Sequence, residues 1–256
     1  MKLYGVFVGI NEYRDPRIKN IRFAVRDAQK FQNIVEARVV KDERKTWLLT
    51  DGHATRDKVI HTIGTELAYQ AGNDDIVLIY FSGHGSPETT PKIDSLSRYL
   101  ILNDTDYYRI FATGIDLERE IPRLLERIRA KLIIVFIDSC FSGMAGGRTF
   151  EGPNLRASGL TPRGELSLNQ LELGEGRVII TASGDNEVAL ENRKLEHGVF
   201  TFQLLRILTD TRNGHSSLGI GSMYELVKSQ VKKYTGDRQC PVLNGRISDA
   251  QIPLFP

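Results

Sequence analysis

The sequence has few cysteines, no long hydrophobic run and almost no excess charge, and each scarcity excludes a class of protein. Its two cysteines, Cys140 and Cys240, are too few for a disulfide framework in a chain of 256 residues. Its longest apolar runs, Ile76–Phe81 and Leu132–Ile137, have six residues each, whereas a membrane-spanning helix needs roughly 18. We therefore expect no membrane segment and a reducing compartment, which favours the cytoplasm.

Charge and motif content exclude further classes of function. The 34 Lys and Arg residues nearly balance the 32 Asp and Glu residues, and no basic stripe predicts a nucleic-acid partner. No Gly-rich phosphate-binding loop is present, and neither cysteine has a metal-ligand spacing. The run Asn103–Asp106 offers oxygen atoms to a cation, but it lacks a calcium-loop pattern and is more typical of a turn. We expect no organic cofactor and assign no metal.

Apolar runs and helical periodicities alternate along the chain. Strands are predicted at Leu3–Ile10, 46–50, Asp75–Ser82, Tyr99–Leu102, Lys131–Asp138, Arg177–Ala182 and 241–244. Helices are predicted at 21–37, 56–71, 116–130, 198–209 and 222–234. Uniformly apolar strands that alternate with helices predict an α/β fold, in which helices cover both faces of a mostly parallel sheet.

One glycine- and proline-rich segment, Phe141–Glu175, interrupts this alternation and predicts a long exposed loop. We expect a single domain over 1–256. It would comprise a larger part at about 1–143, the exposed loop at about 144–175, and a smaller part at about 176–256.

Two predicted strands end in reactive side chains, in the segments Tyr80–Gly85 and Ile137–Gly143. Active sites of parallel sheets lie at the carboxyl ends of the strands, so neighbouring strands would bring His84 and Cys140 together. The imidazole could accept the thiol proton and later protonate a leaving amine. The backbone amides of Gly85 and Cys140 are candidates for an oxyanion hole. Taken singly, each side chain is more typical of a packing or turn residue.

These two motifs resemble the histidine and cysteine motifs of the caspase-like cysteine peptidases, in particular the metacaspases and bacterial caspase homologues. Four further segments resemble that branch: Val8–Tyr13, Ala24–Ala28, Thr181–Ser183 and His197–Thr201. The resemblance spans about residues 3–210 and implies a caspase-like three-layer sandwich. Animal caspases read an acidic residue with arginines, and Phe141 replaces the arginine of their cysteine motif here.

The resemblance also implies a pocket for the residue before the scissile bond. In metacaspases, positions that match Asp27 and Asp138 line this pocket, and Ser183 falls in a region that contributes to its wall. Two carboxylates favour a cationic guest, and arginine offers a planar bidentate fit. This implies an endopeptidase that cleaves after Arg, or Lys, through a thioester on Cys140. The alternative is that Asp138 caps a turn and Asp27 lies on a helix surface.

The glycine-rich segment carries three arginines that such a peptidase could cleave in itself, Arg148, Arg156 and Arg163. Members of the family often divide in this region, although arginines in a plain solvated loop are an equal alternative. Expected partners are proteins with exposed Arg or Lys sites and an upstream protease that nicks the loop. The resemblance to bacterial members implies a stress or defence pathway. Many metacaspases are activated by calcium.

Two other functions remain open. The fold could serve as a catalytically silent interaction module, although an intact pair of His84 and Cys140 argues against this. The pair could also hydrolyse another kind of amide. Turnover of an arginine-containing peptide would separate these alternatives.

Overall fold

The computed structural model describes residues 1–90, 93–141, 148, 152–153, 173–184, 187–210, 218–246 and 252–255, and six of its strands form the central sheet. Their order is β11-β8-β7-β3-β1-β2. The strands are β1 (Leu3–Gly9), β2 (Arg44–Thr50), β3 (Ile76–Ser82), β7 (Leu132–Asp138), β8 (Arg177–Thr181) and β11 (Val242–Arg246). All neighbours pair in parallel except β11, which pairs antiparallel with β8. The prediction of a mostly parallel sheet is confirmed.

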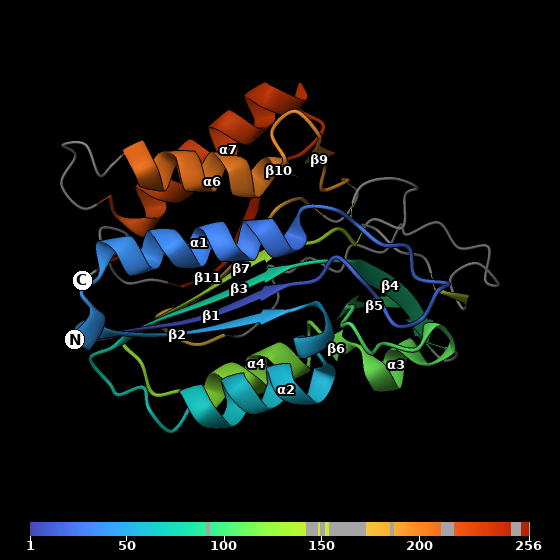
Figure 1. The fold of residues 1–256 in the computed structure, drawn as a ribbon, viewed down its shortest axis with the longest axis horizontal. Helices are drawn as coiled ribbons and strands as arrows, with labels where there is room; N and C mark the ends of the chain where they lie inside the picture. The colour runs from blue at the N-terminus through green and yellow to red at the C-terminus, as the bar shows by residue number, and fades with distance from the viewer. Residues whose placement is uncertain are drawn as a thin grey trace.

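Helices cover both faces of this sheet (Figure 1). One face carries α1 (Ala24–Arg38), α6 (Val199–Asp210) and α7 (Ile220–Thr235). The other face carries α2 (Arg56–His61), which continues as a π-type turn over Thr62–Leu67, and α4 (Glu120–Glu126). Short turns lie at Lys41–Glu43, Asp51–His53 and Tyr107–Arg109, and α3 (Ile110–Thr113) is a single helical turn. The predicted three-layer α/β sandwich is confirmed.

The side chains of each central strand divide between two hydrophobic cores. In β3, Val77, Ile79 and Phe81 belong to the core shared with α2 and α4. Between them, Ile76, Leu78 and Tyr80 point to the core shared with α1 and α6. Alternate residues of a strand face opposite ways, so a strand that is covered on both faces must be apolar throughout. This is why the central strands stand out in the sequence.

Two smaller sheets flank the central one. Strands β4 (Gly85–Thr90), β5 (Ile93–Leu100) and β6 (Ile115–Asp116) form the first, and β9 (Glu191–Asn192) and β10 (His197–Gly198) form the second. The sequence predicts a strand only at Tyr99–Leu102. The rest of the first sheet escapes prediction because its strands are polar and lack the apolar runs of the central sheet.

The predicted helix at 116–130 is too long. The carboxylate of Asp116 accepts the backbone N–H groups of Glu118 and Arg119, both at 2.9 Å, and this side-chain capping turns the chain from β6 toward α4. The helix therefore covers only Glu120–Glu126.

The prediction of an exposed loop over 144–175 is wrong at three described residues, Arg148, Gly152 and Leu173, which are buried. Arg148 is the clearest case. Its side chain is 0% exposed, because buried carboxylates draw the guanidinium into the protein. Most other residues of 144–175 lie outside the described part of the chain, including Arg156 and Arg163. None of the described helices combines the length and the hydropathy that a membrane span requires.

Candidate active site

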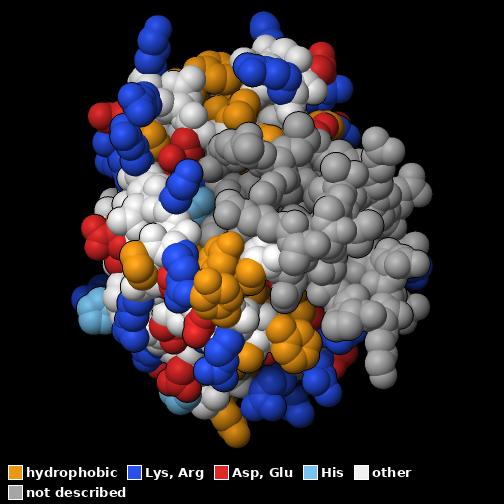
Figure 2. Space-filling view, turned by 90° about the vertical axis from the view of Figure 1, so that its right-hand side faces the viewer, with side chains coloured by type: hydrophobic (Ala, Val, Ile, Leu, Met, Phe, Trp, Pro, Cys, Tyr) orange, Lys and Arg blue, Asp and Glu red, His pale blue; other side chains and the backbone are white. Residues whose placement is uncertain are grey.

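Strands β3 and β7 lie side by side and end at the same edge of the sheet. Their register pairs Ser82 with Asp138, so His84 and Cys140 each follow two residues beyond a paired position. The two loops also contact each other, because the Ser139 hydroxyl donates to the Gly83 carbonyl at 2.8 Å. The structure therefore brings the two predicted catalytic side chains to one edge. Figure 2 faces this edge, where acidic and basic side chains are interspersed among the described residues.

The approach of the two loops depends on glycine at position 85. A Cβ atom on Gly85 would lie 2.5 Å from the carbonyl oxygen of Cys140 and 2.6 Å from the Phe141 ring. Neither distance is tolerable for a side-chain carbon, so the loop after β3 can meet the loop after β7 only without a side chain here.

The imidazole of His84 is buried and held by its neighbours. Its Nε2 atom lies 2.7 Å from the Lys19 carbonyl, and its ring packs on Tyr13 at a centroid distance of 5.2 Å. The Tyr13 hydroxyl accepts the backbone N–H of His84 at 2.8 Å. A carbonyl oxygen only accepts, so Nε2 carries the proton in the neutral ring. Burial lowers the pKa of His84, while hydrogen bonds to the carbonyls of Arg148 and Lys19 oppose this effect.

The thiol of Cys140 is also buried, and its Sγ atom donates to the Glu187 carbonyl at 3.1 Å. The second cysteine, Cys240, is partly exposed, and its thiol donates to the Pro241 carbonyl. Its backbone N–H donates to the carboxylate of Glu187.

A buried acidic pocket lies beside this pair of residues, and the side chain of Arg148 occupies it. The Arg148 Nη2 atom lies 2.5 Å from Asp27 and 3.3 Å from Glu191. Its Nη1 atom lies 3.0 Å from the Asp138 carboxylate and donates to the Ser82 hydroxyl at 2.5 Å. Asp27, Asp138 and Arg148 are each 0% exposed. We call the carboxylates of Asp27, Asp138 and Glu191, together with the Ser82 hydroxyl, the acidic pocket.

The charge of the pocket is only partly balanced, because three carboxylates face one guanidinium. Burial raises the pKa of Asp138 to about 6; the Arg148 guanidinium opposes this rise and the negative charge of Asp27 adds to it. The Thr201 hydroxyl donates to Asp138 at 2.5 Å and holds the carboxyl group in place.

The backbone of Arg148 is bound as firmly as its side chain. Its N–H donates to the Ala189 carbonyl at 3.2 Å, and its carbonyl accepts the N–H of Gly85 at 3.1 Å. The same carbonyl also lies close enough to the His84 imidazole to influence its pKa. The carbonyl group of an arginine thus lies between the predicted oxyanion-hole amide and the predicted catalytic imidazole.

Not every predicted site residue joins these contacts. Among the described residues, the partners of the Arg148 guanidinium do not include Ser183, whose hydroxyl donates to the Glu187 carbonyl at 3.4 Å. Sequence reasoning missed Ser82 and Glu191 as pocket residues. Ser82 lies within the histidine motif, so its position next to the predicted site could have indicated a role in the pocket. No local sequence pattern indicates such a role for Glu191.

The aspartates weighed as cation ligands serve other groups. Asp104 accepts the backbone N–H of Arg56 at 2.8 Å, and Asp106 accepts that of Tyr108 at 2.8 Å. Within the described part of the chain, no group of three or more His, Cys, Asp or Glu side chains is arranged to hold a metal ion.

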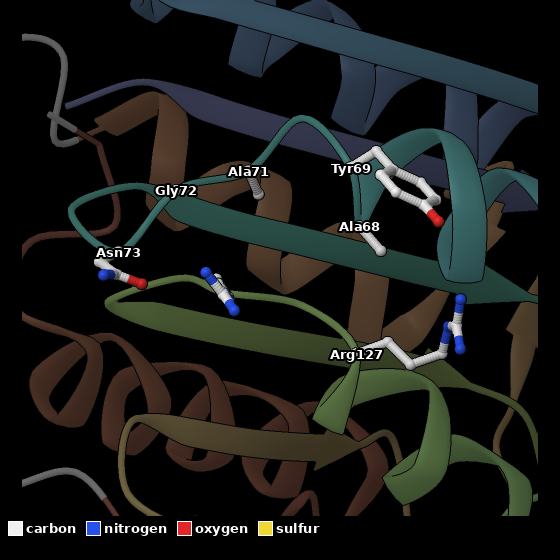
Figure 3. Close-up of a pocket in the computed structure, with 7 residues that line it drawn as sticks. Ala68, Tyr69, Ala71, Gly72, Asn73 and Arg127 are labelled. Carbon is white, nitrogen blue, oxygen red and sulfur yellow. The ribbon is translucent and has the colours of Figure 1, made fainter.

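A second hollow, of about 570 Å³, lies at the opposite edge of the sheet, where the chain enters β3 and β7 (Figure 3). It is lined by Ala68, Tyr69, Ala71, Gly72, Asn73, Arg127 and Arg129. These residues include neither a carboxylate nor a nucleophile for acyl transfer, and the Nε atom of Arg127 already donates to the Gly64 carbonyl at 2.9 Å. The hollow is therefore not the candidate catalytic site.

Comparison with known proteins relates this geometry to a family. A sequence model of the caspase domain matches residues 4–250. The search of curated proteins returned no match. A solved structure from Geobacter sulfurreducens, a structural-genomics target, matches with a TM-score of 0.73 at 20% identity, over 100% of this chain and 98% of that chain. Caspase-1 from Spodoptera frugiperda matches with a TM-score of 0.63 at 10% identity, over 96% of this chain and 87% of that chain. At these identities, the two structures share the fold.

Proposed function

The chain belongs to the caspase family of peptidases, and from this premise we propose that it is a cysteine endopeptidase that cleaves proteins after arginine, and after lysine less well. Cys140 is the nucleophile and His84 the general acid and base. Asp27, Asp138 and Glu191 bind the cationic side chain that precedes the cut. The proposal extends to membership of the metacaspase branch and to cleavage of the chain by itself.

One observation carries this proposal: Arg148 is held as a substrate residue would be. Its guanidinium fills the acidic pocket, while its carbonyl accepts from Gly85 at 3.1 Å and also contacts His84. A pocket built only for stability would have no reason to direct the carbonyl of its guest toward the amide of Gly85, next to a histidine. The paired carboxylates would repel an acidic side chain, so cleavage after aspartate is not expected.

The residues supply each step of acyl transfer. His84 takes the proton of the Cys140 thiol, and the sulfur forms a bond to the carbonyl carbon of the arginine. The amides of Gly85 and Cys140 stabilise the negative charge on the carbonyl oxygen. The carbon–nitrogen bond then breaks, and His84 returns the proton to the leaving amine. Water hydrolyses the resulting thioester and regenerates the thiol, so the reaction needs no organic cofactor.

A panel of three fluorogenic peptides, identical except for Arg, Lys or Asp before the reporter group, tests the proposal. We expect the Arg peptide to turn over fastest, the Lys peptide more slowly, and the Asp peptide not at all. Arginine can engage Asp27 and Asp138 together through its two terminal nitrogens, whereas lysine presents a single point charge. Continued silence toward all three after proteolytic nicking within residues 144–175 would instead favour a non-catalytic interaction module.

The activity toward the Arg peptide should fall as the pH is lowered through about 6. Asp138, whose pKa is raised to about 6, gains a proton there, and the pocket loses one of the charges that bind the guest. Burial lowers the pKa of His84, so protonation of its imidazole is shifted to lower pH. A pH profile of kcat/KM checks this, with Asp138→Asn as the comparison. The variant should be less active throughout and should lack the fall near pH 6; a profile parallel to that of the wild type would contradict the assignment.

The proposal also covers partners and activation. Substrates would be proteins with accessible Arg or Lys sites, and an upstream protease that nicks 144–175 would be a second route to an open active site. Cleavage after Arg148 would give fragments 1–148 and 149–256. Arg156 and Arg163 remain alternative sites of self-cleavage, and Ser183 remains a predicted pocket-wall residue. The resemblance to bacterial caspase homologues supports a cytoplasmic role in stress or defence, and calcium dependence stays open to test.

A further inference from the structure

The short hairpin formed by β9 and β10 lies against the acidic pocket. Gly198 pairs with Glu191 across the hairpin, and the carboxylate of Glu191 contacts the Arg148 guanidinium at 3.3 Å. The N–H of Gly198 donates to Asp27 at 3.1 Å. A Cβ atom at position 198 would lie 2.4 Å from Asp138, so the hairpin packs directly on the pocket floor.

Next to Gly198, His197 contacts Asp27 from the side opposite to the guest. Its Nδ1 atom lies 2.5 Å from Asp27 Oδ1, while Asp27 Oδ2 faces the Arg148 Nη2 atom at 2.5 Å. The carboxylate of Asp27 is 0% exposed and the His197 side chain 10% exposed. Oδ1 of Asp27 is thus held by His197, while Oδ2 accepts the Gly198 N–H and also meets the guest.

From this arrangement we infer that His197 is a positioning residue that makes the pocket select arginine over lysine, an inference that rests on the proposed function. The imidazole N–H sets the plane of the Asp27 carboxylate, so that Oδ2 meets one arm of a planar guanidinium while Asp138 and Ser82 meet the other. His197 does not touch the guest in the described contacts, so it acts through Asp27.

The discrimination follows from the geometry of the two cations. A guanidinium donates along fixed directions in one plane, so its binding depends on the orientation of each acceptor. An ammonium group has three rotatable donors and binds mainly as a point charge, so it tolerates a turned carboxylate. Loss of the His197 hydrogen bond should therefore weaken arginine binding more than lysine binding, although the charge of Asp27 is unchanged.

Three substitutions in the full chain test this inference. His197→Leu removes the donor, His197→Gln extends its amide to the position of Nε2, and His197→Asn keeps an N–H near the position of Nδ1. Glu196→Gln is the control, because Glu196 lies in the same hairpin with 55% of its side chain exposed and pairs only with Arg26 in the described contacts. For each variant, kcat and KM are measured with the Arg and Lys peptides, and the melting temperature is recorded.

We expect the ratio of kcat/KM for Arg over Lys to fall about tenfold in His197→Leu and His197→Gln, mainly through KM for Arg. His197→Asn and Glu196→Gln should keep the wild-type ratio. The ratio is the decisive quantity because both peptides must displace the same Arg148 side chain from the pocket. A substitution that changes how tightly Arg148 binds affects both peptides equally and leaves their ratio unchanged. If His197→Leu does not fold, the comparison of Gln with Asn decides.

Three outcomes separate the claims. An unchanged ratio in His197→Gln, in a protein whose wild type cleaves after arginine, overturns the positioning role and leaves the proposed function intact. A wild type that cleaves neither peptide, even after proteolytic nicking within residues 144–175, overturns the proposed function itself. A lower melting temperature with an unchanged ratio would mark His197 as a structural residue only.

Discussion

Purified Cys140→Ala protein is expected to remain a single uncut chain, whereas the wild type divides after Arg148. The wild-type chain holds the Arg148 carbonyl at Gly85 and His84, and its Cys140 thiol is the nucleophile of the proposed reaction. Without the sulfur, no thioester can form. Turnover of the Arg peptide should also fall by about ten-thousand-fold or more, since the remaining groups cannot act without a nucleophile.

Gel mobility and N-terminal sequencing of the fragments check this expectation. The new N-terminus should be Thr149, and Arg148→Gln should abolish that cut while Arg156→Gln and Arg163→Gln leave it in place. Cys240→Ala is the matched control, since it removes the other thiol without touching the proposed dyad. Cleavage that persists in Cys140→Ala would contradict the assignment of the nucleophile, and a first cut after Arg156 or Arg163 would contradict the role given to Arg148.

The position of this candidate dyad could be predicted because its determinants are local. One predicted strand ends at Ser82 and another at Asp138, and each is followed two residues later by a reactive side chain. The rule that parallel strands share a carboxyl edge then brings His84 and Cys140 together without further information. Strands β3 and β7 are buried on both faces, and this makes them continuous apolar runs that the sequence reveals. The same burial fixes the register between β3 and β7 at the candidate site.

Asp27 and Asp138 were predicted from the family resemblance, but the rest of the pocket could not be predicted, because it depends on contacts between distant parts of the chain. Glu191 and His197 lie on a hairpin whose strands have two residues each, too short for any periodicity to appear. Arg148 lies in a glycine-rich segment that predicts exposure, and only the buried carboxylates of Asp27 and Asp138 explain its burial. A charged side chain that is predicted to be exposed can be buried when oppositely charged partners from several separate elements surround it.

The Asp27→Asn substitution should reduce kcat/KM for the Arg peptide by roughly 30- to 1000-fold. Asp27 and the guest guanidinium form a fully buried charge pair at 2.5 Å, and loss of one charge from such a pair costs about 2–4 kcal/mol. The asparagine side chain has nearly the same shape, so the change removes charge without opening a cavity. The loss should also extend to the Lys peptide, because either cation needs the negative charge.

A loss of activity toward both peptides distinguishes Asp27→Asn from the His197 substitutions, which should reduce activity toward the Arg peptide more than toward the Lys peptide. Asp57→Asn is the control: Asp57 is an exposed carboxylate on α2, across the sheet from the pocket, and its loss should leave both peptides unaffected. Steady-state kinetics with the two peptides provide the measurement. Full activity of Asp27→Asn toward arginine would mean that Arg148 occupies the acidic pocket for stability alone, and that the specificity of the enzyme is determined elsewhere.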